Sequence, residues 1–129
     1  MTGVRSLSGW WGVVLDAPDP LALAQFYRGL LGWEIASQEA DWVTMRVPGT
    51  TSYLAFKTET SFERPTWPAE PGRQQMMLHL DIGVGDLDGA VADALALGAV
   101  LASYQPQEDV RVLLDPAGHP FCLYTDAEG

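Results

Sequence analysis

Two histidines and one cysteine are the side chains of this chain most suited to chemistry near neutral pH. His79 lies in an apolar run, MMLHLDIGV, where its imidazole has three interpretations: a polar group in a cavity wall, a former metal ligand, or a catalytic acid–base residue. His119, between Gly118 and Pro120, is better explained by a local turn. Cys122 has no basic neighbour in the sequence that would lower its pKa, which favours an inert buried thiol.

The elements that must position these groups occur twice along the chain. A strand at Met77–Val84 precedes a helix that is capped by Asp86 and ended by Gly98. A strand at Trp10–Asp16 precedes a similar helix, which begins with Asp19-Pro20. Three strands follow each helix, and they are predicted at Trp33–Ser37, Trp42–Val47 and Ser52–Thr58 and again at Val100–Tyr104, Val110–Asp115 and Pro120–Thr125.

A nearly constant offset in residue number superposes the two halves, so that Asp19 falls on Asp86, which predicts two like modules within one domain. We expect a single domain over residues 1–129, with module one at 9–58, a linker at 59–75 and module two at 76–126. The linker contains three prolines, which exclude a helix or a central strand.

The composition narrows the class of protein. The chain has 129 residues, of which 47% are hydrophobic, so it can bury a core. A formal net charge of −10 argues against nucleic acid and against an anionic membrane surface as partners. The sequence has one cysteine, and it lacks both a signal peptide and an apolar run long enough to span a membrane. These features predict a cytoplasmic protein.

Three stretches resemble the vicinal oxygen chelate superfamily, which includes glyoxalase-type lyases, extradiol dioxygenases and bleomycin and fosfomycin resistance proteins. They are DPLALAQFYRGLLGW at 19–33, HLDIGVGDLDGAVADALALG at 79–98 and DPAGHPFCL at 115–123. The resemblance covers nearly the whole chain, and it implies an α+β fold. Two βαβββ modules with curled sheets would enclose a cavity, and two chains would form a homodimer.

The resemblance also implies where a metal would bind. Metal-dependent members place four ligands on four strands, and the matching positions here are Gly12, Ala55, His79 and Cys122. Glycine and alanine have no ligand atom, whereas a catalytic divalent site generally needs three protein ligands. We therefore expect no metal cofactor. The alternative is a divalent metal held with help from a nearby Asp16, Asp81 or Tyr124.

Strand alternation predicts which side chains would line the cavity. In the strand around His79, Leu80, Ile82 and Val84 form one apolar face for a helix, which leaves His79 and Asp81 on the other face. An alternative for the aromatic residues is that they simply fill the core. The predicted pocket residues are Trp10, Asp16, Phe56, Trp67, His79, Asp81, Tyr104, Cys122 and Tyr124.

The expected function is binding of a small apolar or aromatic molecule in this cavity without a catalytic metal. The alternative is a metal-dependent lyase, isomerase or dioxygenase of the superfamily, or a metal-free enzyme that uses His79 for acid–base catalysis. A third possibility is an interaction module whose cavity is filled by side chains. The expected partners are a small-molecule ligand and a second copy of the chain, with Trp10, Trp11 and Trp67 near the contact.

Overall fold

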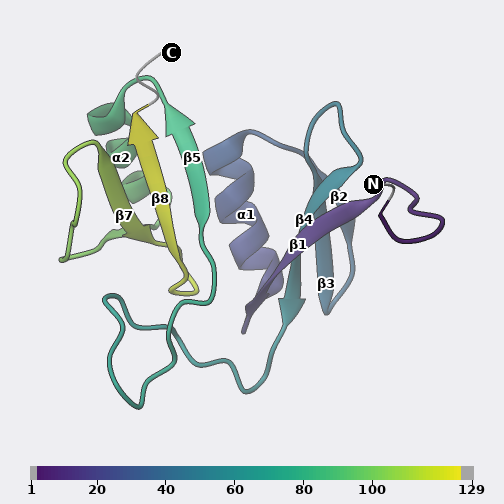
Figure 1. Ribbon diagram of the computed structural model, residues 1–129, viewed down its shortest axis with the longest axis horizontal. Coiled ribbons are helices and arrows are strands. Elements are labelled where there is room, and N and C mark those ends of the chain that lie inside the picture. The colour runs from purple at the N-terminus through teal and green to yellow at the C-terminus, as the bar shows by residue number, and fades with distance from the viewer. Residues whose placement is uncertain (1–2, 126–129) are drawn as a thin grey trace. The chain divides into compact units, whose positions relative to one another are not determined.

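A computed structural model describes residues 3–125, which form two compact units divided in the sequence between Thr60 and Ser61. Each unit contains one helix and one four-stranded mixed sheet (Figure 1). The strand order is β1-β4-β3-β2 in the first unit and β5-β8-β7-β6 in the second. The α+β class and the pair of βαβββ modules are therefore confirmed. The ends of the predicted 1–129 range, including residue 126 of module two, lie outside the described residues.

Module one follows the predicted order of elements. Its first and last strands, β1 and β4, pair in parallel, and the remaining neighbours pair antiparallel. The elements are β1 (Trp11–Ala17), α1 (Pro20–Leu31), β2 (Ile35–Gln38), β3 (Trp42–Arg46) and β4 (Ser52–Thr58).

The ends of α1 confirm the capping that the sequence predicts. The Asp19 side chain accepts a hydrogen bond from the Ala22 backbone N–H at 3.1 Å, and Pro20 occupies the first helical turn. At the other end Gly32 has a φ of 73°, and its N–H donates to the Arg28 carbonyl oxygen at 2.9 Å. The helix therefore starts and stops where its end groups can be satisfied.

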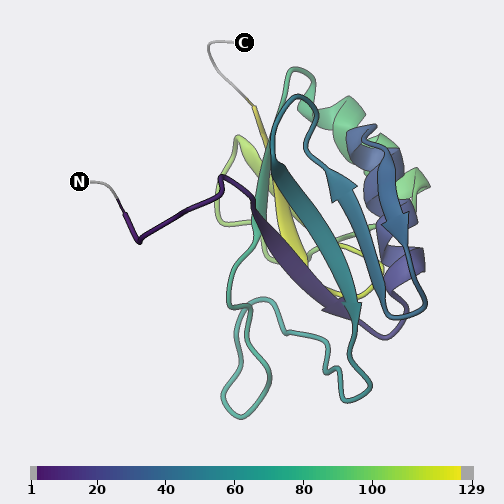
Figure 2. The same cartoon turned by 90° about the vertical axis from the view of Figure 1, so that its right-hand side faces the viewer.

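One face of the module-one sheet packs against α1, as Figure 2 shows. The helix buries Leu23, Phe26 and Tyr27, and the Tyr27 ring stacks on the Phe56 ring of β4 with centroids 5.9 Å apart. On the opposite face, which we call the open face, Val14 is 41% exposed. The residues of β1 alternate between the two faces, with Leu15 buried toward the helix and Asp16 exposed.

Module two repeats this topology. Its first and last strands, β5 and β8, pair in parallel, and the Asp86 side chain caps its helix by accepting from the Gly89 backbone N–H at 3.0 Å. The elements are β5 (Leu80–Val84), α2 (Leu87–Ala96), β6 (Val100–Leu101), β7 (Val110–Leu114) and β8 (Pro120–Thr125).

The helix of module two buries much less than α1 does. Its buried residue is Ala94, whereas Leu95 is 43% exposed. The core of this module lies mainly in the sheet, where Leu113, Phe121 and Leu123 are buried. An alanine-rich helix offers little side-chain area, so the strands supply most of the buried apolar area of module two.

Three predicted strands extend at least two residues beyond the observed ones at one end. β2 begins at Ile35 rather than Trp33, and β5 begins at Leu80, which leaves Met77 81% exposed. β6 ends after Leu101, although the Ala102 N–H still donates to the Val112 carbonyl oxygen at 3.0 Å. Beyond that point the Gln105 amide donates to the carbonyl oxygens of Ala102 and Val112 and accepts from the Val112 N–H, each at 2.8 Å. Local alternation cannot reveal such a contact.

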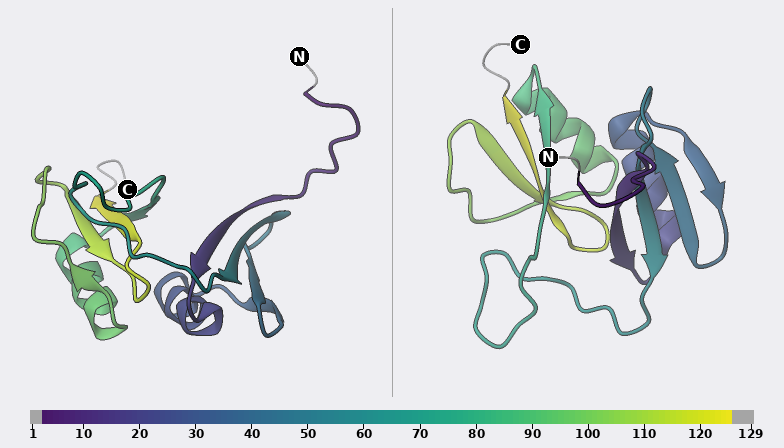
Figure 3. Two further views of the ribbon diagram at one scale, coloured as in Figure 1. Left: turned by 90° about the horizontal axis from the view of Figure 1, so that it is seen from below. Right: turned by 45° about the vertical axis from the view of Figure 1, so that its right-hand side comes forward.

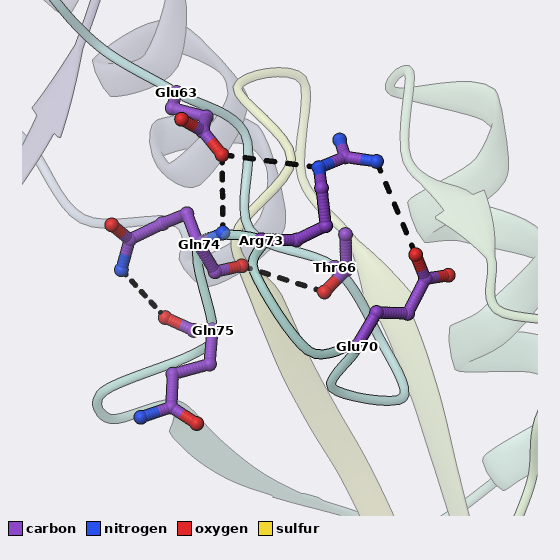
Figure 4. A network of polar contacts seen from close by, with 6 residues as sticks. All are labelled: Glu63, Thr66, Glu70, Arg73, Gln74 and Gln75. Atoms are coloured by element: carbon purple, nitrogen blue, oxygen red, sulfur yellow. Dashed lines mark hydrogen bonds and ion pairs between the residues drawn. The ribbon is translucent and has the colours of Figure 1, made fainter.

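The segment between β4 and β5 is a loop that packs with module two (Figure 3). Arg64 donates to the Pro116 carbonyl oxygen at 3.1 Å, and the Phe62 and His119 rings lie 5.3 Å apart. Figure 4 shows the polar contacts within the loop, where Glu63 accepts from the Gln74 N–H at 3.1 Å and pairs with Arg73. These groups are exposed, so each pair contributes little to stability.

No helix within residues 3–125 has both the length and the apolar character that crossing a membrane would require.

Candidate functional site

Three chemically active side chains come together on module two. Asp81 and Cys122 are direct partners in the parallel β5–β8 pair, and His79 lies just before β5, on the same side of the chain as Asp81. Their ligand-type atoms all lie within 4.8 Å of one another, and His79 Nε2 is 3.1 Å from Asp81 Oδ1. Alternate side chains share a strand face, so the extended backbone itself creates this group, which we call the polar cluster.

Cys122 is held as a neutral thiol. Burial, followed by the Asp81 carboxylate that accepts its hydrogen bond, raises the pKa of Cys122 to about 11. At neutral pH the thiol therefore keeps its proton and is a poor nucleophile. This agrees with the inert thiol predicted from the sequence.

The other two members of the polar cluster are open to solvent. The His79 side chain is 36% exposed and the Asp81 side chain 61% exposed. The contact between them orients the imidazole, but an exposed pair of this kind contributes little to folding stability. Exposure leaves both groups accessible to a ligand.

Other predicted pocket residues of module two lie elsewhere on the same unit. Tyr124 is the partner of Gly83, and this pair lies two residues beyond Asp81 and Cys122 along β5 and β8. The Tyr124 ring lies over Gly83. Trp67 and Tyr104 form a pair of their own: the indole N–H donates to the Tyr104 carbonyl oxygen at 3.2 Å, and the ring centroids are 6.0 Å apart.

Module one has a groove on its open face, with a volume of about 310 Å³. The Arg46 guanidinium carbon lies 4.7 Å from the centroid of the Trp10 ring, a cation–π contact. Trp10 was predicted as a pocket residue, but the others were missed, although alternation along β3 places Trp42, Thr44 and Arg46 on one face. The groove is lined by Trp10, Ala36, Trp42, Thr44, Met45, Arg46 and Tyr53.

Asp16 and Phe56 are the other two predicted pocket residues that lie in module one. Asp16 is exposed on the open face, because it alternates along β1 with the buried Leu15 and Ala17. The placement of Phe56 in a pocket wall is corrected, because its ring is fully buried against Tyr27 of α1. Successive residues of a strand point to opposite faces, so Phe56 cannot share the face of its neighbour Ala55.

The residues of module one do not fit the metal centre that the superfamily implies. Gly12 offers no ligand atom, and even a Cβ there would overlap the Tyr53 ring and the Tyr53 carbonyl oxygen. Ala55 is fully buried, with Val14 and Thr44 as its partners on the adjacent strands. The four-ligand arrangement is therefore absent at two positions, and at one of them aromatic carbon takes the space.

Paired βαβββ modules of this topology define the glyoxalase fold of the vicinal oxygen chelate superfamily. A family model described as a glyoxalase-like domain matches residues 12–124, and the chain belongs to this family. No protein of curated function shows a significant match to the sequence.

Solved structures show the same fold at low sequence identity. An enzyme of the glyoxalase/bleomycin resistance protein/dioxygenase family from Burkholderia phytofirmans is 20% identical, with a TM-score of 0.65 over 88% of this chain and 95% of that one. The fosfomycin resistance protein FosX from Mesorhizobium loti is 13% identical, with a TM-score of 0.65 over 92% of both chains. Lactoylglutathione lyase from Agrobacterium tumefaciens is 17% identical, with a TM-score of 0.57 over 95% and 96%.

Proposed function

We propose that this glyoxalase-like protein binds a small, flat aromatic molecule and that this binding needs no catalytic metal. The observation that carries the proposal is the groove of module one, where the rings of Trp10, Trp42 and Tyr53 line about 310 Å³. Ligand sites typically measure about 300–1,000 Å³, so this groove suits a molecule of one or two rings. Aromatic walls favour stacking on a planar ligand.

The charge of the groove narrows the ligand class. The whole chain carries −10, yet the groove places the Arg46 guanidinium beside Trp10. A guanidinium binds a carboxylate through two parallel hydrogen bonds, so an acidic group on the ligand would complement Arg46. The Thr44 hydroxyl, 2.6 Å from the Ser37 hydroxyl, adds a polar contact at the wall of the groove. The proposed ligand is therefore a flat aromatic acid.

Titration calorimetry with 2-naphthoate tests this function on protein kept in EDTA. We expect binding that Trp42→Ala weakens by about two- to tenfold, because one ring–ring contact is worth about 0.5–1.5 kcal/mol. Arg46→Ala should weaken binding of 2-naphthoate but leave binding of the neutral 2-naphthylmethanol unchanged. Trp67→Ala, in module two, is the matched aromatic control and should retain the affinity of the native chain.

Two results would contradict the proposal. One is equal affinity for the native chain and Trp42→Ala, which would place the ligand outside the groove. The other is binding of 2-naphthoate that occurs only after a divalent metal is added. If neither result is found, a thermal-shift screen of metabolites and aromatic antibiotics would identify the natural ligand class, because a ligand that binds the folded state raises Tm.

The second candidate function is an enzyme of the same superfamily, favoured by the contact between His79 and Asp81 at 3.1 Å. A carboxylate that orients an imidazole is a common arrangement for acid–base catalysis. Lactoylglutathione, from the name of the Agrobacterium neighbour, is a first test substrate. If this function holds, His79→Ala abolishes turnover while circular dichroism shows intact folding. Turnover that survives this substitution would end the candidate.

We also propose that the chain forms a homodimer in the cytoplasm, the location that its single cysteine favours. Trp11 is 64% exposed at the start of β1, and burying such a ring contributes about 1.5–3 kcal/mol. Repulsion between two chains of −10 is screened by salt beyond about 8–10 Å. Light scattering at micromolar concentration should show a dimer that Trp11→Ala weakens. A particle of 14.0 kDa throughout would contradict it.

A further inference from the structure

Outside the groove, the described residues contain one group with three different metal-ligating atoms, the polar cluster of module two. It supplies an imidazole from His79, a carboxylate from Asp81 and a thiol sulfur from Cys122, all within 4.8 Å of one another. The superfamily arrangement would combine His79 and Cys122 with Gly12 and Ala55 of module one, which have no ligand atoms. Asp81 is not one of those four positions. The set of residues that can act as ligands in this chain therefore differs from the set that the superfamily uses.

We propose that module two by itself binds a thiophilic divalent cation, such as Zn²⁺, through His79, Asp81 and Cys122. The proposal concerns module two alone, so it stands independently of ligand binding by the groove of module one.

The distances allow the three side chains to close around an ion. Zinc bonds of about 2.0–2.3 Å in a tetrahedral site place ligand atoms about 3.3–3.8 Å apart. The atoms here lie within 4.8 Å, so the widest separation must shrink by at most about 1.5 Å. The His79 and Asp81 side chains are 36% and 61% exposed, and they can rotate without disturbing the core. The backbone need not move, because Asp81 and Cys122 are already register partners.

The types of ligand atom decide which ion is preferred. Cys122 would bind as a thiolate, and its proton would be released to solvent when the ion binds. A thiolate and an imidazole favour Zn²⁺ and similar ions, whereas Mg²⁺, Ca²⁺ and Mn²⁺ prefer sites made of oxygen atoms. Three protein ligands leave a fourth position for water or for a bound molecule. The chain therefore has the ligand set of an open three-ligand site on one module, in place of a four-ligand site across two.

Cobalt titration of the full chain, purified without an affinity tag and stripped with chelator, tests this site. Co²⁺ is the spectroscopic probe for Zn²⁺ because a thiolate ligand produces a charge-transfer band in the near ultraviolet. We expect one equivalent of Co²⁺ to produce this band, and we expect Zn²⁺ but not Mg²⁺ to abolish it. Cys122→Ser should remove the band, and His79→Gln and Asp81→Asn should each weaken binding by at least about tenfold, as loss of a metal-supporting group does.

His119→Gln is the matched control, since it removes the other histidine of the chain, whose ring lies against Phe62. It should bind Co²⁺ with the affinity of the native chain. Native mass spectrometry gives the stoichiometry without relying on the band, and circular dichroism checks that each variant is folded. Absence of the band at stoichiometric Co²⁺, or unchanged affinity in Cys122→Ser, would overturn the proposal.

Discussion

Within each module, corresponding positions of the first and last strands are paired, but the two modules carry different side chains at these positions. In each module the first and last strands pair in parallel, and one constant offset in residue number relates the two registers. The corresponding open-face residues are Gly12, Val14 and Ala55 in module one and His79, Asp81 and Cys122 in module two. The repeated fold therefore fixes where side chains lie, while the two copies differ in the side chains themselves: an aromatic groove in one and a polar cluster in the other.

The helix-facing sides of the two sheets also differ. α1 buries Leu23, Phe26 and Tyr27, whereas α2 buries Ala94. Since buried apolar area is the main source of folding free energy, we expect the helix to contribute more to the stability of module one than to that of module two. Substitutions on the two faces and in the two modules can test this contrast.

The largest effect is expected for Phe56→Ala in module one. The Phe56 ring is fully buried and stacks on Tyr27, so its removal should lower the free energy of unfolding by about 3–5 kcal/mol. Leu101→Ala in module two is the control, because this apolar side chain is 43% exposed and should cost about 0.5 kcal/mol or less. Urea denaturation measures both. A Phe56→Ala loss as small as that of the control would contradict the assignment of Phe56 to the core.

A smaller loss of folding stability is expected when a metal-ligating side chain is placed at Gly12. Gly12→His would force side-chain atoms into the Tyr53 ring and carbonyl oxygen, and overpacking of this kind costs about 1–3 kcal/mol. Adding Tyr53→Ala should recover only part of that loss, because the carbonyl oxygen remains. Val14→His, at an exposed position of the same strand, should change the free energy of unfolding by about 0.5 kcal/mol or less. An equally small change for Gly12→His would show that the space is not filled.

The pH dependence of alkylation sharpens the contrast at Cys122. Its pKa is raised to about 11, so the folded state keeps the proton and the iodoacetamide rate should rise through pH 9 and 10. In urea the alkylation rate of the same thiol should have its inflection near the ordinary thiol pKa of 9.0. Asp81→Asn removes the negative charge beside the thiol, which should lower the pKa of Cys122 and move the inflection of the folded state to lower pH. A plateau near pH 9 in the native protein would contradict the raised pKa.

The fold was largely predictable from the sequence because its signals are local. Asp19, Gly32 and Asp86 mark helix ends, and the constant offset between matching positions of the two halves reveals the duplication. The early end of β6 was not predictable, because the Val112 N–H of the neighbouring strand donates to the Gln105 side chain and not to a backbone carbonyl oxygen.

The candidate site was predictable only in part. His79, Asp81 and Cys122 share a strand face, which alternation reveals, but their mutual distances depend on the register of β5 with β8. The groove of module one was missed apart from Trp10, because it depends on the pairing of β3 with β4 and on how the Tyr53 ring lies over Gly12. Single-sequence patterns give the face of a residue, and strand pairing decides its neighbours.

The most direct test of different roles for the two modules is an NMR map of backbone amide shifts in two samples of the full chain, one with EDTA and one without. Titration with 2-naphthoate in EDTA should shift the amides of Trp42, Arg46 and Tyr53. Titration of the EDTA-free protein with Zn²⁺ should instead shift those of Asp81 and Cys122. Naphthoate shifts that centre on Asp81 and Cys122, or that appear only after Zn²⁺ is added, would contradict the proposed division of function.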